Sequence, residues 1–354
     1  MVNTVTVSID GMGGDYAPGM IVEGVELACQ KNKNIRFLIF GDANILQDLL
    51  TRHPKAQAVS EVRHAPDMIS MDDRPTTALR SGKNSSMRLA IDAVKNNEAS
   101  AVVSAGNTGA LMAMATIVLK MMPGISRPAI VTSFPTQNGD CVMLDLGANI
   151  ECDANNLVQF AVMGEVFARY ELDIDHPSVA ILNVGVEGLK GNVAVKEAAA
   201  ILKNSSLPVK FAGFVEGDDI GKGTVDVIVT DGFTGNIALK TAEGTSNLII
   251  FFLKKFLSDN LMGKIGALIA RPALNRFKSH FDPRRYNGAM LVGLNGICVK
   301  SHGGTDPIGF AHAIEAGVKL VEQNFNKVIK QDLVKLTDVD QNKTLESNTK
   351  KALN

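Results

Sequence analysis

The sequence contains no tryptophan, only four cysteines and almost no net charge. The cysteines form no CxxC pair and show no metal-binding spacing with the six histidines. This argues against a metal site or a disulfide framework, and it predicts reduced thiols in a cytoplasmic protein. A formal net charge of -1 excludes a chain that binds nucleic acid through its overall charge, so any basic surface has to be local.

Targeting segments and common catalytic motifs are also absent. Residues 1–10 lack the basic start of a signal peptide. The run Ala99–Leu119 is uncharged and long enough for a membrane span, but Ser104, Gly106 and Asn107 interrupt it, so we expect a strand, a loop and a helix. There is no GxSxG elbow, P-loop or HExxH motif, and no cysteine lies in a glycine-rich loop. A covalent protein nucleophile is therefore not indicated.

A repeated unit of buried strand, glycine-rich loop and helix organises the chain. In its clearest copy, Val225–Lys240, a β-branched run stops at Asp231, two glycines follow, and a helical pattern begins at about Ile237. Backbone N–H groups at such strand ends attract anions. The alternative is a tight connection whose glycines only permit the turn. The unit recurs in the strand-end loops DGMGGD, SAGNTGA, DLGAN, GVEGLKGN and DGFTGN, with SHGG as a sixth loop.

The alternation of buried strands with helices predicts an α/β protein with a mostly parallel sheet. Residues 1–335 are expected to form a single catalytic domain, with a weaker strand at Ala56–Val62, and the polar tail 336–354 is expected to be disordered. We expect the strand-end loops to gather into one basin of amide donors that suits phosphate. Lys190 is the one lysine in these loops and would bind the anion. His302 is the one histidine, either an acid–base group or a structural residue.

The segment 254–285 differs from the rest because it is basic and amphipathic. It carries eight lysines or arginines against two aspartates, and apolar residues lie between them. We expect a helical hairpin that binds a membrane surface or an acidic partner. A helix pair that packs on the sheet or on a second subunit fits the pattern equally well.

Several motifs together resemble the bacterial phosphate acyltransferase family of phospholipid synthesis (PlsX family). The resemblance runs from Thr4 to about Ile329. Its motifs are DGMGGDYAP, NSSM, SAGNTGALM, LDLGAN, LVQFAVMG, LNVG, KGN, TDGFTGN, YNGA and SHG.

This resemblance implies a fold and a reaction. The fold is a doubly wound, three-layer α/β sandwich similar to the phosphate acetyltransferase and isocitrate dehydrogenase group, with a protruding helical hairpin. Inorganic phosphate reversibly takes a long-chain acyl group from acyl carrier protein, without cofactor or metal, and the acyl phosphate enters phosphatidic acid synthesis. The resemblance also implies a homodimer, peripheral association with the inner face of the cell membrane and its anionic surface, and transfer of product to a membrane glycerol-3-phosphate acyltransferase.

Candidate site residues follow from their positions in the motifs. Lys190 and Asn236 are assigned to phosphate binding and to stabilisation of the thioester oxyanion, with His302 as a third catalytic candidate. The substrate-binding candidates are Gly13, Gly14, Asn107, Thr108, Asn149, Asn192, Asp231 and Thr234. The candidates for binding a partner or a membrane are Lys264, Arg271, Arg276, Lys278, Arg284 and Arg285.

Two other functions stay open. A nicotinamide-dependent dehydrogenase fits the fold group, but Tyr16 stands where the GxGxxG fingerprint needs a third glycine, and Asp10 and Asp15 place negative charge near a pyrophosphate. A non-catalytic membrane adaptor fits the basic segment, but it leaves the strand-end loops without a purpose.

Overall fold

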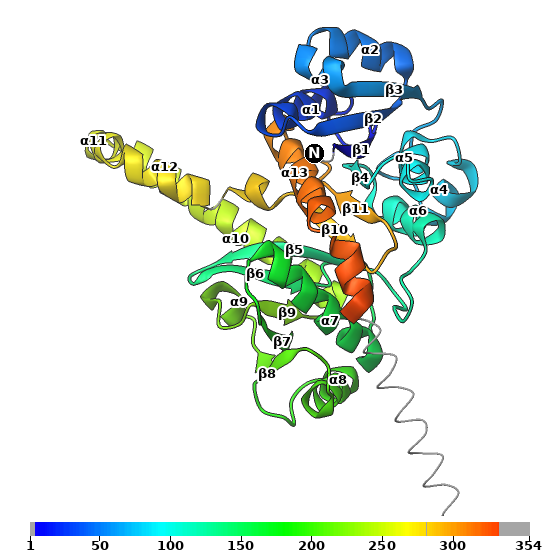
Figure 1. The fold of residues 1–354 in the computed structure, drawn as a ribbon. Helices are drawn as coiled ribbons and strands as arrows, with labels where there is room; N and C mark the ends of the chain where they lie inside the picture. The colour runs from blue at the N-terminus through cyan, green and yellow to red at the C-terminus, as the bar shows by residue number, and fades with distance from the viewer. Residues whose placement is uncertain (1–3, 281, 333–354) are drawn as a thin grey trace, which may run out of the picture.

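The computed structural model describes residues 4–280 and 282–332 (Figure 1). Its centre is one eleven-stranded sheet with the order β3-β2-β1-β4-β11-β10-β5-β6-β9-β7-β8. The strands are β1 (Val5–Asp10), β2 (Ile35–Gly41), β3 (Ser60–His64), β4 (Ala101–Ser104), β5 (Ala129–Thr136), β6 (Gly139–Leu144), β7 (Ser178–Leu182), β8 (Lys210–Val215), β9 (Val227–Val229), β10 (Ala289–Val292) and β11 (Ile297–Lys300).

Helices cover both faces of the sheet. They are α1 (Gly19–Lys31), α2 (Ala43–Thr51), α3 (Pro54–Val59), α4 (Pro75–Ser81), α5 (Ser86–Lys95), α6 (Thr108–Leu119), α7 (Ala154–Glu171), α8 (Val193–Asn204), α9 (Asp219–Lys222), α10 (Gly232–Ser258), α11 (Leu261–Ile269), α12 (Arg271–His280), the 3-10 helix η1 (Pro283–Tyr286) and α13 (Pro307–Glu322). One apolar layer contains α1, α7, α8 and α13, and the other contains α4, α5 and α6. This arrangement confirms the predicted three-layer α/β sandwich.

Strand direction changes partway across the sheet. β10 pairs antiparallel with both β11 and β5, and β5 pairs antiparallel with β6. The other neighbouring pairs in the described sheet are parallel. The strands β1, β4 and β11 therefore run opposite to β6, β9 and β7, and the carboxyl ends of the two groups lie at opposite edges of the sheet.

The prediction of a weak strand at Ala56–Val62 is wrong over its first half, which belongs to the helix α3. Pro54 occupies the first turn of α3, where its missing N–H costs nothing. The N–H of Ala56 donates to Glu26 Oε2 at 2.7 Å, so this helix start is tied to α1. The strand begins only at Ser60. The tail predicted to be disordered, 336–354, lies outside the described residues.

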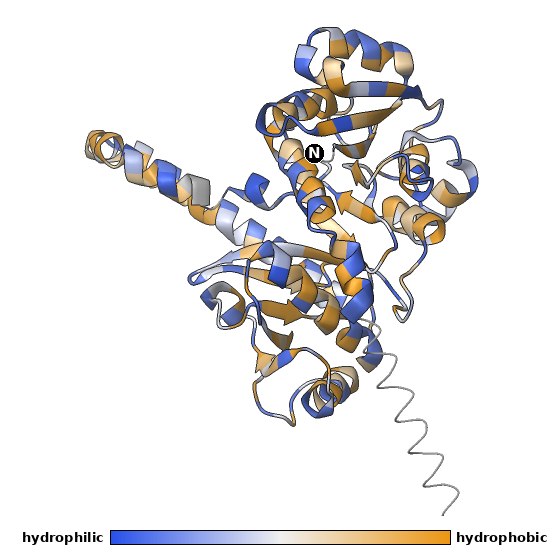
Figure 2. Ribbon diagram, in the orientation of Figure 1, coloured by the Kyte–Doolittle hydropathy of each residue, from blue (hydrophilic) through white to orange (hydrophobic). Residues whose placement is uncertain are grey.

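A long arm projects from the sheet (Figure 1). It consists of the outer part of α10 together with α11 and α12, so the predicted hairpin is built from three helices. Only Gly232 and Gly235, at the base of the 27-residue α10, are buried. Figure 2 shows hydrophobic residues along the arm although it projects from the body. Within the described ranges, no helix combines the length and apolar character that a membrane span requires.

Candidate functional site

The strand-end loops form two groups, because the strands that carry them run in opposite directions. We name the loops after β1, β4 and β11 the first loop set; they comprise residues 11–18, 105–107 and 301–306. We name the loops after β6 and β7 and the start of α10 the second loop set; they comprise residues 145–153, 183–192 and 230–236. The predicted single basin of strand-end loops is therefore not formed within one chain, because the reversals of strand direction at β10 and β6 separate the loops.

Direct main-chain contacts join the three loops of the first set. The N–H of Asp15 donates to the carbonyl of Gly303 at 2.9 Å. A side chain at Gly13 would overlap the Asp10 carboxylate and lie 2.8 Å from the nitrogen of Gly106. Gly14 has φ = +112°, which a residue with a side chain rarely adopts. These two glycines let the chain after β1 pack directly on the loops after β4 and β11.

A buried carboxylate lies beneath the first loop set. Asp10 accepts hydrogen bonds from Ser86 Oγ at 2.6 Å and Ser104 Oγ at 2.7 Å. Burial raises the pKa of Asp10, and the two hydroxyl donors oppose that rise. Asp10 therefore ties the end of β1 to the first residue of α5 and to the end of β4.

A buried lysine lies beneath the same loop set. Lys300 ends β11, and its Nζ donates to the carbonyls of Ala105 and Ser301. Burial lowers the pKa of Lys300 to about 8, against the opposing effect of Asp10 and Asp15. Lys300 is not among the residues predicted from the sequence; the signal that could have found it is a lysine that closes the apolar run ICVK directly before the SHGG loop.

The side chain of Asn107 is used within the protein. Its Oδ1 accepts from the N–H of Ala110 at 3.0 Å and so caps α6. Its Nδ2 lies 2.8 Å from the carbonyl of Met71 and 2.9 Å from that of Asp73. The next residue, Thr108, is exposed at the first position of α6. Asn107 thus organises the loop, and its amide is already engaged.

His302 is exposed, and its ring orientation is defined by its own loop. Its Nδ1 accepts from the N–H of Gly304 at 3.1 Å. This hydrogen bond assigns the proton of the neutral ring to Nε2, which leaves Nε2–H as a donor. An imidazole in this tautomer can donate to an anion.

In the second loop set, the motifs DLGAN and DGFTGN touch. A side chain at Gly235 would overlap the main-chain oxygen of Asp145. The Nδ2 of Asn236 donates to the carbonyl of Leu146 at 3.1 Å and lies close to Gly147, whose φ is +137°. The first turn of α10 therefore packs on the loop after β6, and Asn236 lies at that contact.

Asp145 is a second buried carboxylate. Its oxygens accept from the N–H groups of Ile130 at 2.9 Å, Ala148 at 3.0 Å and Asn149 at 2.7 Å. Burial raises the pKa of Asp145, while these hydrogen bonds oppose the rise. Asn149 Nδ2 donates to Asp145 and to the carbonyl of Pro128, so its amide is engaged within the chain. Its role in substrate binding stays a prediction.

Other polar residues of the second loop set cap helices. Asp231 accepts from the N–H of Thr234 at 2.8 Å and from its hydroxyl at 2.9 Å. The predicted loop from Asp231 to Asn236 is therefore the first turn of α10 rather than a loop. Asn192 caps α8 in the same way, through the N–H of Val195. These side chains cap the first turns of α8 and α10.

Lys190 is different from these capping residues. It lies in the loop that follows β7, and β7 is the neighbour of β9 in the sheet. Its side chain is exposed. Its main-chain N–H donates to the carbonyl of Glu187 at 3.0 Å. In the described part of the chain, the Lys190 ammonium has no hydrogen-bond or ion-pair partner, so it is available to an anion at this edge of the sheet.

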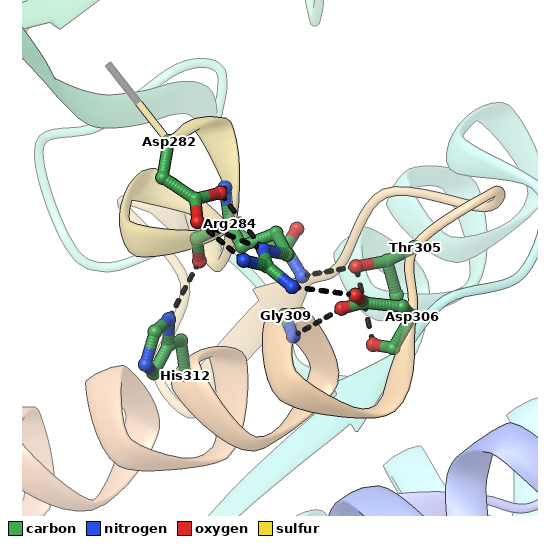
Figure 3. A network of polar contacts seen from close by, with 7 residues as sticks. Asp282, Arg284, Thr305, Asp306, Gly309 and His312 are labelled. Carbon is green, nitrogen blue, oxygen red and sulfur yellow. Dashed lines mark hydrogen bonds and ion pairs between the residues drawn. The ribbon is translucent and has the colours of Figure 1, made fainter. Parts of the chain in front are cut away.

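The basic residues predicted to bind a partner or a membrane divide into two groups. Arg284 donates to Asp282 and, through one terminal nitrogen at 2.9 Å, to Asp306, as Figure 3 shows. Two carboxylates of the same chain therefore already bind Arg284, and its role in binding a partner stays a prediction. The other candidates are exposed (Lys264, Arg271, Arg276, Arg285), or have a side chain outside the described residues (Lys278).

The described residues form no candidate metal centre. Within residues 4–280 and 282–332, no three His, Cys, Asp or Glu side chains lie close enough together to hold a metal ion.

The chain is similar to known proteins over most of its length. A family model described as "Fatty acid synthesis protein" matches residues 5–328. The phosphate acyltransferase of Paramagnetospirillum magneticum is 56% identical over 332 residues, which cover 94% of this chain and 95% of the relative.

Solved structures with this arrangement are more distant in sequence. A phosphotransacetylase from Streptococcus pyogenes gives a TM-score of 0.62 at 19% identity, covering 90% of this chain and 94% of that chain. A branched-chain phosphotransacylase from Enterococcus faecalis V583 gives 0.57 at 15% identity, covering 90% and 99%. At these identities the likeness shows a shared fold alone.

Proposed function

This chain belongs to the Fatty acid synthesis protein family and is an acyltransferase, and from that premise we propose that it transfers a long-chain acyl group reversibly from acyl carrier protein to inorganic phosphate. The acyl phosphate then serves phosphatidic acid synthesis. One observation supports the phosphate site most directly: the exposed Lys190, whose ammonium has no partner among the described residues, lies at the same sheet edge as the N-terminus of α10. Backbone N–H groups and an ammonium together suit a phosphate dianion.

In the proposed reaction, a phosphate oxygen attacks the thioester carbonyl. A C–O bond forms, the C–S bond breaks, and the carrier leaves as a thiolate that takes up a proton. Lys190 would hold the phosphate, and Asn236 would help to stabilise the oxyanion that develops on the carbonyl. The neutral His302 would donate through Nε2–H.

The cysteines argue against a covalent acyl-enzyme. Burial raises the pKa values of Cys141 and Cys298 to about 12, and that of the partly buried Cys152 to about 12 as well. Burial raises the pKa of Cys29 to about 11. Thiols with such pKa values are poor nucleophiles near neutral pH, because the thiolate is the reactive form. This favours phosphate itself as the nucleophile.

We propose that two copies of the chain complete the site. The two loop sets lie at opposite edges of one sheet, so the first set of one copy would meet the second set of the other. The outer half of α10 supports a homodimer, because it exposes Phe251, Phe252 and Phe256 to solvent in the single chain. An apolar helix face of this kind is expected to be covered by another surface.

The tip of the arm supports a further proposed contact. Leu261, Met262 and Ile269 are each at least 74% exposed, and Lys264 and Arg271 lie among them. Apolar side chains flanked by basic ones suit an anionic membrane surface, and the charges also suit acyl carrier protein as an acidic partner. Peripheral association with the inner face of the cell membrane would bring the product to a membrane glycerol-3-phosphate acyltransferase.

The dehydrogenase alternative is not favoured. A dinucleotide-binding turn joins its strand closely to a helix whose N-terminus faces the pyrophosphate. Here residues 11–18 separate β1 from α1, and the α1 N-terminus follows Pro18, which offers no side-chain cap. The buried Asp10 carboxylate also lies directly under that loop.

The direct test is phosphate-dependent release of carrier protein. The purified full chain is mixed with long-chain acyl carrier protein, with and without inorganic phosphate, and both free carrier and acyl phosphate are measured. We expect both products only with phosphate, little of either with Lys190→Ala, and normal amounts with Lys203→Ala, an exposed lysine on α8. Release that is equal without phosphate, or no release at all, would reject the proposed reaction.

A further inference from the structure

The YNGA motif, Tyr286–Ala289, has no part in the reaction described so far. It lies where the chain returns from the arm and enters β10. Because β10 is antiparallel to β11, the start of β10 lies beside the end of β11, at the edge that carries the first loop set. The motif is therefore adjacent to the loop 301–306, which contains His302.

The side chain of Asn287 makes three hydrogen bonds, all of them to that loop. Its Oδ1 accepts from the N–H of His302 at 2.8 Å. Its Nδ2 donates to Ser301 Oγ at 2.9 Å and to Thr305 Oγ1 at 3.2 Å. One side chain thus contacts the residue before His302, His302 itself, and the residue after the two glycines.

The loop needs such an external contact because of its composition. Gly303 and Gly304 follow His302 directly, and glycine has the largest backbone freedom to lose on ordering. Gly304 N–H donates to the imidazole of His302, so the ring is positioned only as well as this loop is.

The neighbours of Asn287 are themselves held by different elements. Tyr286 OH donates to Asp140 at 3.0 Å, and the Tyr286 carbonyl accepts from Thr132 Oγ1 at 3.1 Å. Gly288 has φ = +117°, and a side chain there would lie 2.8 Å from the Cα of Ala313 on α13. The backbone at Asn287 is therefore fixed against β5, β6 and α13.

A second contact joins the same loop to the base of the arm. Figure 3 shows Arg284 between Asp282 and Asp306, and the carbonyl of Arg284 lies 2.8 Å from His312 Nδ1. Asp306 also accepts from the N–H of Gly309 and caps α13. Arg284 thus connects the arm to the carboxyl end of the loop that begins at Ser301.

We propose that Asn287 is a positioning residue for acyl transfer: it fixes the loop 301–306 so that the His302 imidazole keeps its place at the site, with Arg284 as a second tie from the arm. This inference rests on the proposed function for its effect on turnover. The three hydrogen bonds themselves do not depend on that function, so they can be tested separately.

The test compares two asparagines at opposite ends of the β10–β11 hairpin. Asn287→Leu removes all three hydrogen bonds at similar size. Asn295→Leu is the matched control, because Asn295 Nδ2 donates to the carbonyls of Lys120 and Met121 at the far edge of the sheet. Asn287→Asp keeps the acceptor for the His302 N–H, and the Ser301 and Thr305 hydroxyls can rotate to donate to it.

We expect Asn287→Leu to lower kcat by about 10- to 100-fold while KM for phosphate changes much less, since the loss is one of orientation. Asn287→Asp should recover most of kcat, and Asn295→Leu should keep it. Hydrogen exchange at the His302 amide should become faster in Asn287→Leu and stay slow in Asn295→Leu.

Normal kcat in folded Asn287→Leu would overturn the inference, as would a loss no larger than that of Asn295→Leu. Unchanged amide exchange at His302 would overturn it too, whatever the activity. If the wild-type chain formed no acyl phosphate while the exchange result held, the proposed reaction would fail and the loop contact would stand.

Discussion

At the scale of single residues, Asp10 and Lys300 show how the loops are built. Both ionisable groups are buried where the three loops of the first set meet, and their hydrogen bonds go to the ends of neighbouring strands. A buried charge is tolerated only with a partner and with its hydrogen bonds satisfied. The buried Lys300 therefore has a measurable consequence for the pH dependence of stability.

We predict that Lys300 makes the protein more stable as pH rises from about 8 to 10. The unfolded lysine keeps its proton to about pH 10.5, whereas the buried one loses it near pH 8. Between these values the unfolded state binds more protons, so the free energy of unfolding increases with pH.

Urea unfolding of the wild type and of Lys300→Met measures this effect. Above about pH 8, the difference in free energy of unfolding, wild type minus variant, should increase by about 1.4 kcal/mol per pH unit. The total increase should be at most about 3 kcal/mol. If the free energies of unfolding of the two proteins changed in parallel from pH 7.5 to 10, the pKa of Lys300 would not be lowered in the folded protein.

Residue roles were only partly predictable from the sequence. The positions of Lys190 and Asn236 at strand ends follow from buried runs and glycines. The amides of Asn107 and Asn149 could not be assigned, because asparagine caps helices and binds ligands with the same atoms. Only the fold shows that partners within the chain already engage them.

At the scale of elements, α10 connects the site to the arm. Its first turn packs so closely on the loop after β6 that Gly235 has no room for a side chain, whereas Gly244 on the same helix has nothing within 4 Å. The sequence predicts a loop up to Ile237, because two glycines disfavour a helix. The helix nevertheless begins at Gly232, because the Asp231 cap and the close packing override that propensity.

Two glycine-to-alanine variants test this packing. Gly235→Ala should destabilise the protein by about 2–3 kcal/mol or more, because main-chain atoms have to move. Gly244→Ala should be neutral or stabilise by up to about 1 kcal/mol, through helix propensity alone. Thermal unfolding of both variants measures these changes in stability. Equal changes in the two variants would contradict the close contact between α10 and the loop that begins at Asp145.

The arm makes a separate prediction at this scale. Lys264→Glu combined with Arg271→Glu should weaken binding to anionic vesicles, and wild-type binding should fall with added salt. A charge-matched control, Lys203→Glu with Lys210→Glu, reverses exposed lysines on α8 and β8 and should bind normally. Vesicle sedimentation measures both, and equal binding by the two double variants would remove the arm from membrane contact.

At the scale of the whole molecule, the reversal of strand direction decides how the site can be assembled. Local patterns predict that a strand is buried, but they do not say which way it runs in the sheet. The pairing of β10 between β11 and β5 joins segments more than 150 residues apart. The fold class could therefore be predicted from the alternation of strands and helices, whereas the separation of the two loop sets could not.

The most direct measurement is complementation in mixed dimers. Lys190→Ala disables the second loop set and His302→Ala disables the first, so each variant alone should be nearly inactive. If sites form between copies, a mixed dimer contains one site with both residues intact, because one of its two sites is whole. Purified mixed dimers should therefore regain up to about half of the wild-type acyl phosphate formation, and an unseparated co-refolded mixture, in which about half of the dimers are mixed, up to about a quarter. Mixed dimers that stay as inactive as either parent would contradict a site shared between two chains.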